Sequence, residues 1–168
     1  MTMAARAAAN KIVEVSRLEL QGEGTFTGKV HADTLVPHGV GRMEYCPLPQ
    51  QNQRLEEDIK SYEGTWHWGT WHGPSGILEF RNGDTYIGAF YQNARHGQGL
   101  YMWADGRCYE GGFQNNQRHG QGTFTFADGA VYQGEFVGGR RHGYGRYSFP
   151  NGNSYEGQWK EGHYDGYG

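Results

Sequence analysis

The chain has 168 residues and a formal net charge of -3 at pH 7, which gives no electrostatic reason to expect a nucleic acid or an anionic bilayer as its partner. Glycine occurs 29 times, and aromatic residues make up 15% of the chain. This mixture is too rich in rings for a disordered linker and too rich in glycine for helices, so we expect an all-β protein that binds no nucleic acid.

We expect the opening stretch, residues 1–17, not to act as a targeting signal. Its segment MTMAARAAANK lacks the apolar core of a signal peptide, and no run in the chain approaches the roughly 18 apolar residues that cross a bilayer. We expect residues 1–17 to form a tail or a short helix. Cys46 and Cys108 are too few for a disulfide framework, which fits a reduced cytoplasmic setting.

A sequence repeat of 23 or 24 residues runs through the second part of the chain. The stretches YEGTW, YIGAF, YEGGF, YQGEF and YEGQW start at Tyr62, Tyr86, Tyr109, Tyr132 and Tyr155. When the starting Tyr is numbered zero, position two is glycine in every unit. Positions eleven and thirteen are also glycine in the units that start at Tyr86, Tyr109 and Tyr132.

The repeat defines the predicted organisation of the chain. Residues 18–45 form a degenerate first unit, because FTGKV at Phe26 is followed by His38, Gly39 and Gly41. Residues 46–60 contain two prolines and a polar run, so we expect an exposed insertion loop. Residues 61–168 hold four full repeats and one truncated repeat.

Each repeat is predicted to be a β-hairpin. Positions zero, two and four carry Tyr, Gly and Trp or Phe between mostly polar residues, which is the period of a strand with one apolar face. Position seven is Gly or Asn, so we expect a two-residue turn at positions seven and eight. This register places Phe113 across from Gly120, Tyr109 across from Phe124, and Gly122 beside Phe136 of the next hairpin. The glycines thus make room for the rings.

Repetition of this contact predicts the fold class: an elongated, solenoid-like, single-layer antiparallel sheet of stacked β-hairpins. The repeats resemble the MORN (membrane occupation and recognition nexus) family, whose pattern YEGxWxxGxxHGxG they match nearly letter for letter from Tyr62 onward. Residues 18–45 match the pattern more loosely, and residues 46–60 depart from it. The resemblance implies that the hairpins are MORN repeats.

The sequence offers no catalytic or metal-binding constellation, so we expect no enzyme activity, no metal and no cofactor. Position ten is histidine in four repeats (His72, His96, His119 and His142), but identical positions in successive hairpins lie about 10 Å apart, too far to share one zinc ion. We therefore interpret these histidines as structural. Asp105 and Asp128 precede glycines and are typical turn residues, and Cys108 lacks an evident base.

One aromatic face of a single-layer sheet needs cover, and the sequence contains no helix of sufficient length to provide it. We therefore predict a groove in which a partner's amphipathic helix or extended segment is anchored by rings. The predicted groove residues are Tyr86, Phe90, Tyr101, Trp103, Tyr109, Phe113, Phe124, Phe126, Tyr132, Phe136, Tyr147, Phe149, Tyr155 and Trp159. The alternative is that the rings pack on one another and on glycine and leave little groove.

The resemblance to MORN proteins implies a non-enzymatic scaffold or adaptor in cytoskeletal or ciliary assembly. We expect a cytoplasmic location, with a membrane-proximal position as the alternative, and binding to protein partners, which include a second copy of the chain. Such a homodimer would form through the groove or the C-terminal edge strand.

Two alternatives stay open. The first is phospholipid binding, with Arg140 and Arg141 in the segment GGRRHG as lipid contacts. From Tyr62 onward, however, 8 basic residues face 10 acidic ones, which predicts weak or no membrane binding. The second is that the repeats are the targeting region of a larger enzyme, since the sequence stops halfway through a unit.

Overall fold

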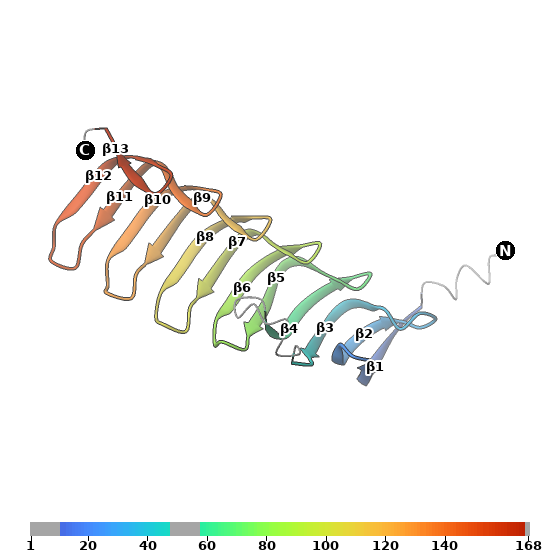
Figure 1. Cartoon of the computed structure of the whole chain (residues 1–168). Helices are drawn as coiled ribbons and strands as arrows, with labels where there is room; N and C mark the ends of the chain where they lie inside the picture. Colours follow the sequence, from blue (N-terminus) through green and yellow to red (C-terminus); the bar gives the residue numbers. More distant parts are fainter. Residues whose placement is uncertain (1–10, 48–57, 167–168) are drawn as a thin grey trace. The chain divides into compact units, whose positions relative to one another are not determined.

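The computed structural model describes residues 11–47 and 58–166, and within them thirteen strands form one antiparallel sheet (Figure 1). Each strand lies beside the strands that precede and follow it in the sequence. None of the described residues is helical, so none belongs to a helix that could span a membrane. The strands are β1 (Ile12–Leu20), β2 (Gly24–His31), β3 (Pro37–Tyr45), β4 (Ile59–His67), β5 (Thr70–Phe80), β6 (Thr85–Tyr91), β7 (Ala94–Met102), β8 (Cys108–Gln114), β9 (Gln117–Thr125), β10 (Val131–Val137), β11 (Arg140–Ser148), β12 (Ser154–Lys160) and β13 (His163–Asp165). The all-β prediction with stacked antiparallel hairpins is confirmed.

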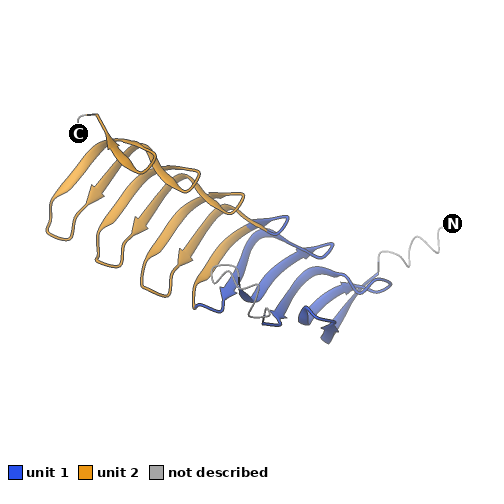
Figure 2. Cartoon of the chain, in the orientation of Figure 1, with its two compact units in different colours: residues 1–82, 90–93 blue, residues 83–89, 94–168 orange. Residues whose placement is uncertain are grey.

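The strands divide into two compact units, shown in blue and orange in Figure 2. Unit 1 comprises residues 1–82 and 90–93, which include β1 to β5 and the end of β6. Unit 2 comprises residues 83–89 and 94–168, which include the start of β6 and β7 to β13. Each unit is described below by itself.

Strand β1 lies partly within the segment that the sequence predicted to be a tail or short helix, and this boundary is corrected. Val13 and Val15 alternate with polar residues and pair with Val30 and Gly28 of β2. Because this alternation of β-branched residues has the period of a strand, it favours sheet over helix. Residues 1–10 lie outside the described part of the chain.

The predicted insertion loop overlaps the next strand by two residues, because β4 already begins at Ile59. Asp58, just before this strand, is buried and accepts a hydrogen bond from Arg81 Nε at 3.2 Å, which ties the start of β4 to the end of β5. Residues 48–57, the rest of the predicted loop apart from Cys46 and Pro47, lie outside the described residues.

The hairpin turn lies one residue earlier than the sequence predicted. In the β8–β9 hairpin, Gln114 pairs with Gln117, so Asn115 and Asn116 form the two-residue turn at positions six and seven. Both have positive φ, 48° and 68°, as a type I′ turn requires. Asparagine tolerates this left-handed conformation better than most residues, and it closes the hairpin here.

A bulge then corrects the register by two residues. Phe113 pairs with Arg118 rather than with Gly120, as the sequence analysis predicted, whereas Gly111 pairs with Gly122 and Tyr109 with Phe124 as expected. The irregularity includes Gly120, whose φ of 71° favours glycine. A shift of two residues leaves every side chain on the same face of the sheet. The alternation of apolar and polar residues in the sequence therefore could not reveal the bulge.

The pairing between neighbouring hairpins, β9 with β10, also differs from the prediction by two residues, although it contains no bulge. Phe136 of β10 pairs with Gly120 of β9, and Gly134 pairs with Gly122. The prediction that Gly122 lies beside Phe136 is therefore wrong. Glycine faces glycine at the centre of each hairpin, and the large rings occupy the rows on either side.

The tyrosine at position zero lies over the paired glycines of its own hairpin. A Cβ atom on Gly122 would lie 2.5 Å from Cε2 and 2.6 Å from Cζ of Tyr109, closer than atoms can approach. The Tyr109 hydroxyl donates a hydrogen bond to the Gly112 carbonyl oxygen at 3.0 Å. Four other repeats have the same bond, donated by Tyr62, Tyr86, Tyr132 and Tyr155 at 2.9 to 3.1 Å. The prediction that glycines make room for rings is confirmed, although a single tyrosine lies over two glycines in the repeats that start at Tyr62, Tyr86, Tyr109 and Tyr132.

The core of unit 2 is a row of rings from positions zero and four, which we call the inner ring row. Consecutive rings contact edge to face, with centroids 4.9 to 5.5 Å apart and interplanar angles of 78° to 90°. Such pairs stabilise one another beyond the area that they bury. The members of the row are Tyr86, Tyr109, Phe113, Tyr132, Phe136, Tyr155 and Trp159.

Replacement of Gly122 by alanine should destabilise the fold by about 2 kcal/mol, because the new methyl group overlaps the Tyr109 ring. The free energy of unfolding in urea measures this cost. In a Tyr109→Leu background, which lacks the ring, the same alanine should cost much less. An equal cost in both backgrounds would contradict the proposed overlap.

Candidate interaction surface

A second row of rings lies beside the inner row in unit 2, and we call it the outer ring row. It alternates positions fifteen and seventeen of successive repeats, and each ring contacts the next at centroid distances of 4.4 to 5.5 Å. The row consists of Tyr101, Trp103, Phe124, Phe126, Tyr147 and Phe149.

The structure places the predicted groove residues at two depths. Nine of the fourteen are buried: Tyr86, Phe90, Tyr101, Tyr109, Phe113, Phe124, Tyr132, Phe136 and Trp159. The other five are partly exposed: Trp103, Phe126, Tyr147, Phe149 and Tyr155. The rings therefore cover one another over most of the face, and the surface open to a partner consists mainly of the position-seventeen residues of the outer row.

An arginine at position nine lies between the two ring rows in successive repeats. The guanidinium carbon of Arg118 lies 5.7 Å from the Tyr109 centroid, 5.3 Å from Phe136 and 5.0 Å from Phe124. Arg141 lies 4.3 Å from the Trp159 ring, and Arg95 lies 5.2 Å from the Tyr101 ring. These are cation–π contacts that join the inner row to the outer row.

Each of these arginines also binds the turn of the following hairpin. Arg118 Nη2 donates to the Gly139 carbonyl oxygen at 2.6 Å, and Arg141 Nη2 donates to the Gly162 carbonyl oxygen at 2.7 Å. The sequence analysis missed this row. The sequence does contain a pattern that could have revealed this row, because position nine is arginine in three consecutive repeats.

The arginines and the outer ring row enclose a pocket of about 350 Å³ in unit 2, which we call the arginine pocket. Its lining residues are Trp103, Arg107, Arg118, Phe124, Phe126, Phe136, Gly139, Arg140, Arg141 and Gly162. The lining thus contains four arginines and four aromatic rings, and none of its residues carries a carboxylate.

Two of the four arginines are paired with acids at the rim. Arg107 Nε lies 2.8 Å from Asp105 Oδ2, and Arg140 Nη1 lies 3.6 Å from Glu161 Oε2. Within residues 11–47 and 58–166, no ion pair links Arg118 or Arg141 to a carboxylate. Burial lowers the pKa of Arg118 and of Arg141, and the charges of Arg107 and Arg141 lower the pKa of Arg118 further.

The structure assigns different environments to the two predicted lipid contacts. The Arg140 side chain is two-thirds exposed, at 66%, and its ion pair with Glu161 is a surface contact. Arg141 lies over three rings and holds the β12–β13 turn. Contact with a lipid by Arg141 would therefore have to compete with its packing role.

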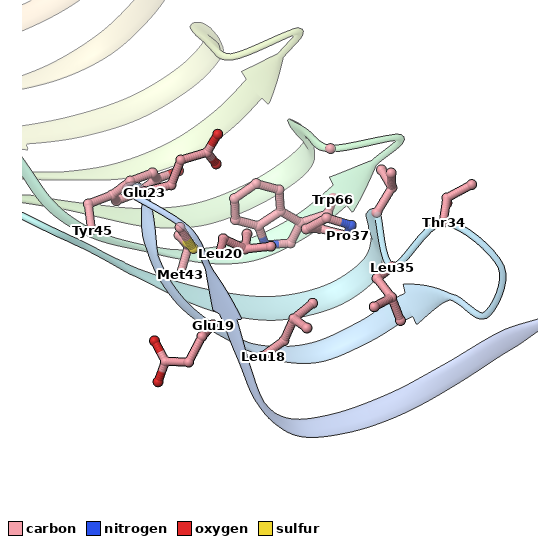
Figure 3. Close-up of a pocket in the computed structure, with 12 residues that line it drawn as sticks. Leu18, Glu19, Leu20, Glu23, Thr34, Leu35, Pro37, Met43, Tyr45 and Trp66 are labelled. Carbon is pink, nitrogen blue, oxygen red and sulfur yellow. The ribbon is translucent and has the colours of Figure 1, made fainter.

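Unit 1 contains a separate pocket of about 500 Å³, which is lined mainly by apolar residues together with Glu19 and Glu23. Figure 3 shows Leu18 and Leu20 of β1, Leu35 of the β2–β3 link and the indole of Trp66 around it. Trp66 is fixed by a hydrogen bond from its Nε1 to the Gly41 carbonyl oxygen at 3.0 Å. Tyr45 also lines the pocket, and burial raises the pKa of its hydroxyl to about 12, so it stays neutral.

A row of histidines in unit 1 lies closer together than the sequence spacing indicated. Ring centroids are 4.5 Å apart for His31 and His38, and 5.4 Å apart for His38 and His67 and for His67 and His72. The spacing argument compared only identical positions, whereas His67 at position five lies between two position-ten residues. His31 is buried and stacks on Trp68, with the ring centroids 3.7 Å apart. Neither of its ring nitrogens has a hydrogen-bond partner among the described residues.

This histidine row does not form a metal site. Among the described residues, no group of three or more His, Cys, Asp or Glu side chains is arranged to hold a metal ion. Asp105 and Asp128 accept hydrogen bonds from the backbone amides of Arg107 and Ala130 at 3.1 and 3.0 Å, as turn residues do.

Acidification should destabilise unit 1 through His38. Burial and the neighbouring His31 and His67 lower the pKa of His38 below its usual value of 6.5. The unfolded chain therefore takes up the proton first, and stability falls as the pH drops through about 6.5 toward the lowered pKa. The amide of Trp68 also donates to His38 Nδ1 at 3.4 Å, a bond that protonation of Nδ1 removes.

Urea unfolding followed by tryptophan fluorescence between pH 7.5 and 5.5 would measure this loss. His38→Gln should flatten the dependence on pH, whereas Val40→Ala, a change at an exposed neighbour in β3, should leave it unchanged. A His38→Gln protein with the same pH dependence as the wild type would contradict the role assigned to His38.

Comparison with known proteins identifies the repeat. A family model of the MORN repeat matches residues 62–85, 86–106, 109–131, 132–154 and 155–168, which together make up more than half of the chain. No curated protein matches the chain. All five matched segments begin at the tyrosine of position zero, and two unmatched residues, Arg107 and Cys108, separate the second segment from the third.

Proposed function

The chain belongs to the MORN-repeat family, and on this basis we propose that it is a non-enzymatic scaffold that binds a protein partner along the outer ring row of unit 2. MORN repeats are generally non-catalytic modules that take part in membrane, lipid or protein interactions. The observation that supports the protein-binding role is the set of four partly exposed rings in the outer ring row, of which Trp103 and Phe126 line the arginine pocket. Exposed apolar surface of this kind usually marks an interaction site.

The partner's anchoring contacts are the rings that remain accessible. Trp103, Phe126 and Phe149 occupy position seventeen of successive repeats and are partly exposed. Aromatic residues and arginine dominate the energetics of protein interfaces, and here both types meet in one concave surface. A partner segment that lies on this surface covers the rings that the sheet itself leaves open.

The cellular role that we propose, assembly of cytoskeletal or ciliary structures in the cytoplasm, rests on the resemblance to MORN adaptors. Self-association through the same surface belongs to this proposal, because a second copy of the chain carries rings that could supply the cover. The rings and arginines of this surface favour a protein partner, but they do not identify which protein binds.

Phospholipid binding has less support in unit 2. Residues 83–89 and 94–168 contain seven basic and eight acidic residues, so the unit lacks the excess of positive charge that draws a protein to an anionic membrane. Arg140 is the exposed predicted lipid contact, and Glu161 already lies beside it.

The double variant Trp103→Ala Phe126→Ala should lose at least tenfold in affinity for the partner, because truncation of two interface rings typically removes this much binding. Partners are first identified by affinity capture with the wild type. Each purified candidate is then titrated against wild-type and variant protein by calorimetry.

The matched control is Tyr144→Ala. Tyr144 is 56% exposed and its side chain points to the opposite face of β11, so this variant should bind normally. Circular dichroism checks the fold of both variants. Unchanged affinity of a folded Trp103→Ala Phe126→Ala protein for every partner would contradict the proposed function. Phe113 and Phe136 are unsuitable for this test because they are buried.

A further inference from the structure

We propose that the arginine pocket selects an amphipathic helix that carries acidic residues seven positions apart, one for Arg118 and one for Arg141. The inference rests on the proposed function, since the helix belongs to the protein partner, and it adds the charge and the spacing of the segment that binds.

The charge of the partner follows from the hydrogen bonds that Arg118 and Arg141 lack. A guanidinium group has five N–H donors, and each of these two arginines donates a single hydrogen bond to the described residues, through Nη2. Both line the pocket, and neither has an ion pair with a carboxylate of the described chain. Partly buried charges are normally paired, so the missing group is an anion that a ligand brings.

Carboxylates fit these positions in geometry as well as in charge. Each guanidinium lies over rings of the pocket, 5.0 Å from the Phe124 centroid for Arg118 and 4.3 Å from the Trp159 centroid for Arg141. The guanidinium group is planar, and its N–H donors form a fork. A planar carboxylate accepts two parallel hydrogen bonds from such a fork. The aromatic lining receives apolar side chains between the acids, which makes the ligand amphipathic.

The spacing of the arginines favours a helix over an extended segment. Arg118 and Arg141 occupy the same position in consecutive repeats, and consecutive hairpins advance by two strand spacings, about 9.6 Å. An α-helix rises about 10.5 Å over seven residues and returns to the same face. In an extended strand, residues on one face lie about 6.7 or 13 Å apart, and neither distance matches the repeat.

An amphipathic helix is also more compatible with the charges of unit 2 than a membrane. The rim of the pocket holds Asp105 and Glu161 beside Arg107 and Arg140. These acids repel a continuous anionic surface, whereas a helix can place its carboxylates at Arg118 and Arg141 and turn neutral or basic residues to the rim.

The test uses fluorescently labelled helical peptides with an alanine and glutamine background. The first carries two Glu residues seven positions apart with Leu and Phe between them on the same face. The second has Gln in place of both Glu, and the third has the two Glu five positions apart, which puts them on different faces. Phosphatidylserine-containing vesicles form a separate arm. Binding is measured by fluorescence anisotropy, or by co-sedimentation for the vesicles.

The first peptide should bind wild-type protein at least tenfold more tightly than the second and the third, and it should shift the Arg118 and Arg141 Nε–H resonances in NMR spectra. Arg118→Gln Arg141→Gln should abolish the preference. Arg146→Gln, an exposed change on the opposite face, should keep it. The comparison among peptides on wild-type protein stands even where the double variant fails to fold.

Equal binding of the three peptides, including a complete lack of binding, would overturn the inference, as would a preference for the vesicles that Arg118→Gln Arg141→Gln removes. The proposed function fails separately. If a natural partner is lost in Trp103→Ala Phe126→Ala but retained in a folded Arg118→Gln Arg141→Gln protein, the scaffold role stands and the acidic helix is excluded.

Discussion

The close contact between a tyrosine ring and two facing glycines is the constraint on which each repeat depends. Gly111 and Gly122 pair across the β8–β9 hairpin, and a Cβ on either would meet the Tyr109 ring or the opposite backbone within 2.7 Å. The ring can lie flat on the sheet only because both side chains are absent. Its hydroxyl then reaches the Gly112 carbonyl oxygen and fixes the ring along the strand. Glycine usually weakens a strand, but here the tyrosine fills the space that glycine leaves.

The remaining layers of unit 2 follow from the position of that ring. A flat tyrosine presents its edge and face to the position-four rings on both sides, which builds the inner ring row. Arg118 then covers this row and reaches the outer row through Phe124. A single-layer sheet therefore obtains a core without a second layer, because side chains of one face cover one another. Because the inner rings are covered in this way, the surface open to a partner consists of the rings at position seventeen and the N–H groups of the arginines.

In unit 1 a position-zero tyrosine also contacts neighbouring rings edge to face, but the residue at position nine differs. Tyr62 contacts Trp66 and Phe90 edge to face at 5.1 and 5.0 Å, as the tyrosines of unit 2 contact their neighbours. At position nine, however, it has Trp71, which stacks on Tyr62 and donates a hydrogen bond from Nε1 to the Tyr45 hydroxyl. In this repeat of unit 1, tryptophan thus takes the place that arginine has in the repeats of unit 2.

Four features follow from the sequence alone: the repeat, the strands, the side of the sheet on which each ring lies, and the need for glycine beneath the rings. The alternation and spacing of residues reveal them because both depend only on local geometry. The sequence determined the register only in part. The pairs Gly111–Gly122 and Tyr109–Phe124 follow from it, but the bulge that puts Phe113 opposite Arg118 leaves the alternation unchanged, so the alternation could not reveal it. Nor did the sequence determine the depth of the predicted groove or the role of Arg118 and Arg141. These depend on how rings from neighbouring hairpins pack, and the tertiary structure alone shows that Tyr109 and Phe136 bury each other while Phe126 stays partly open.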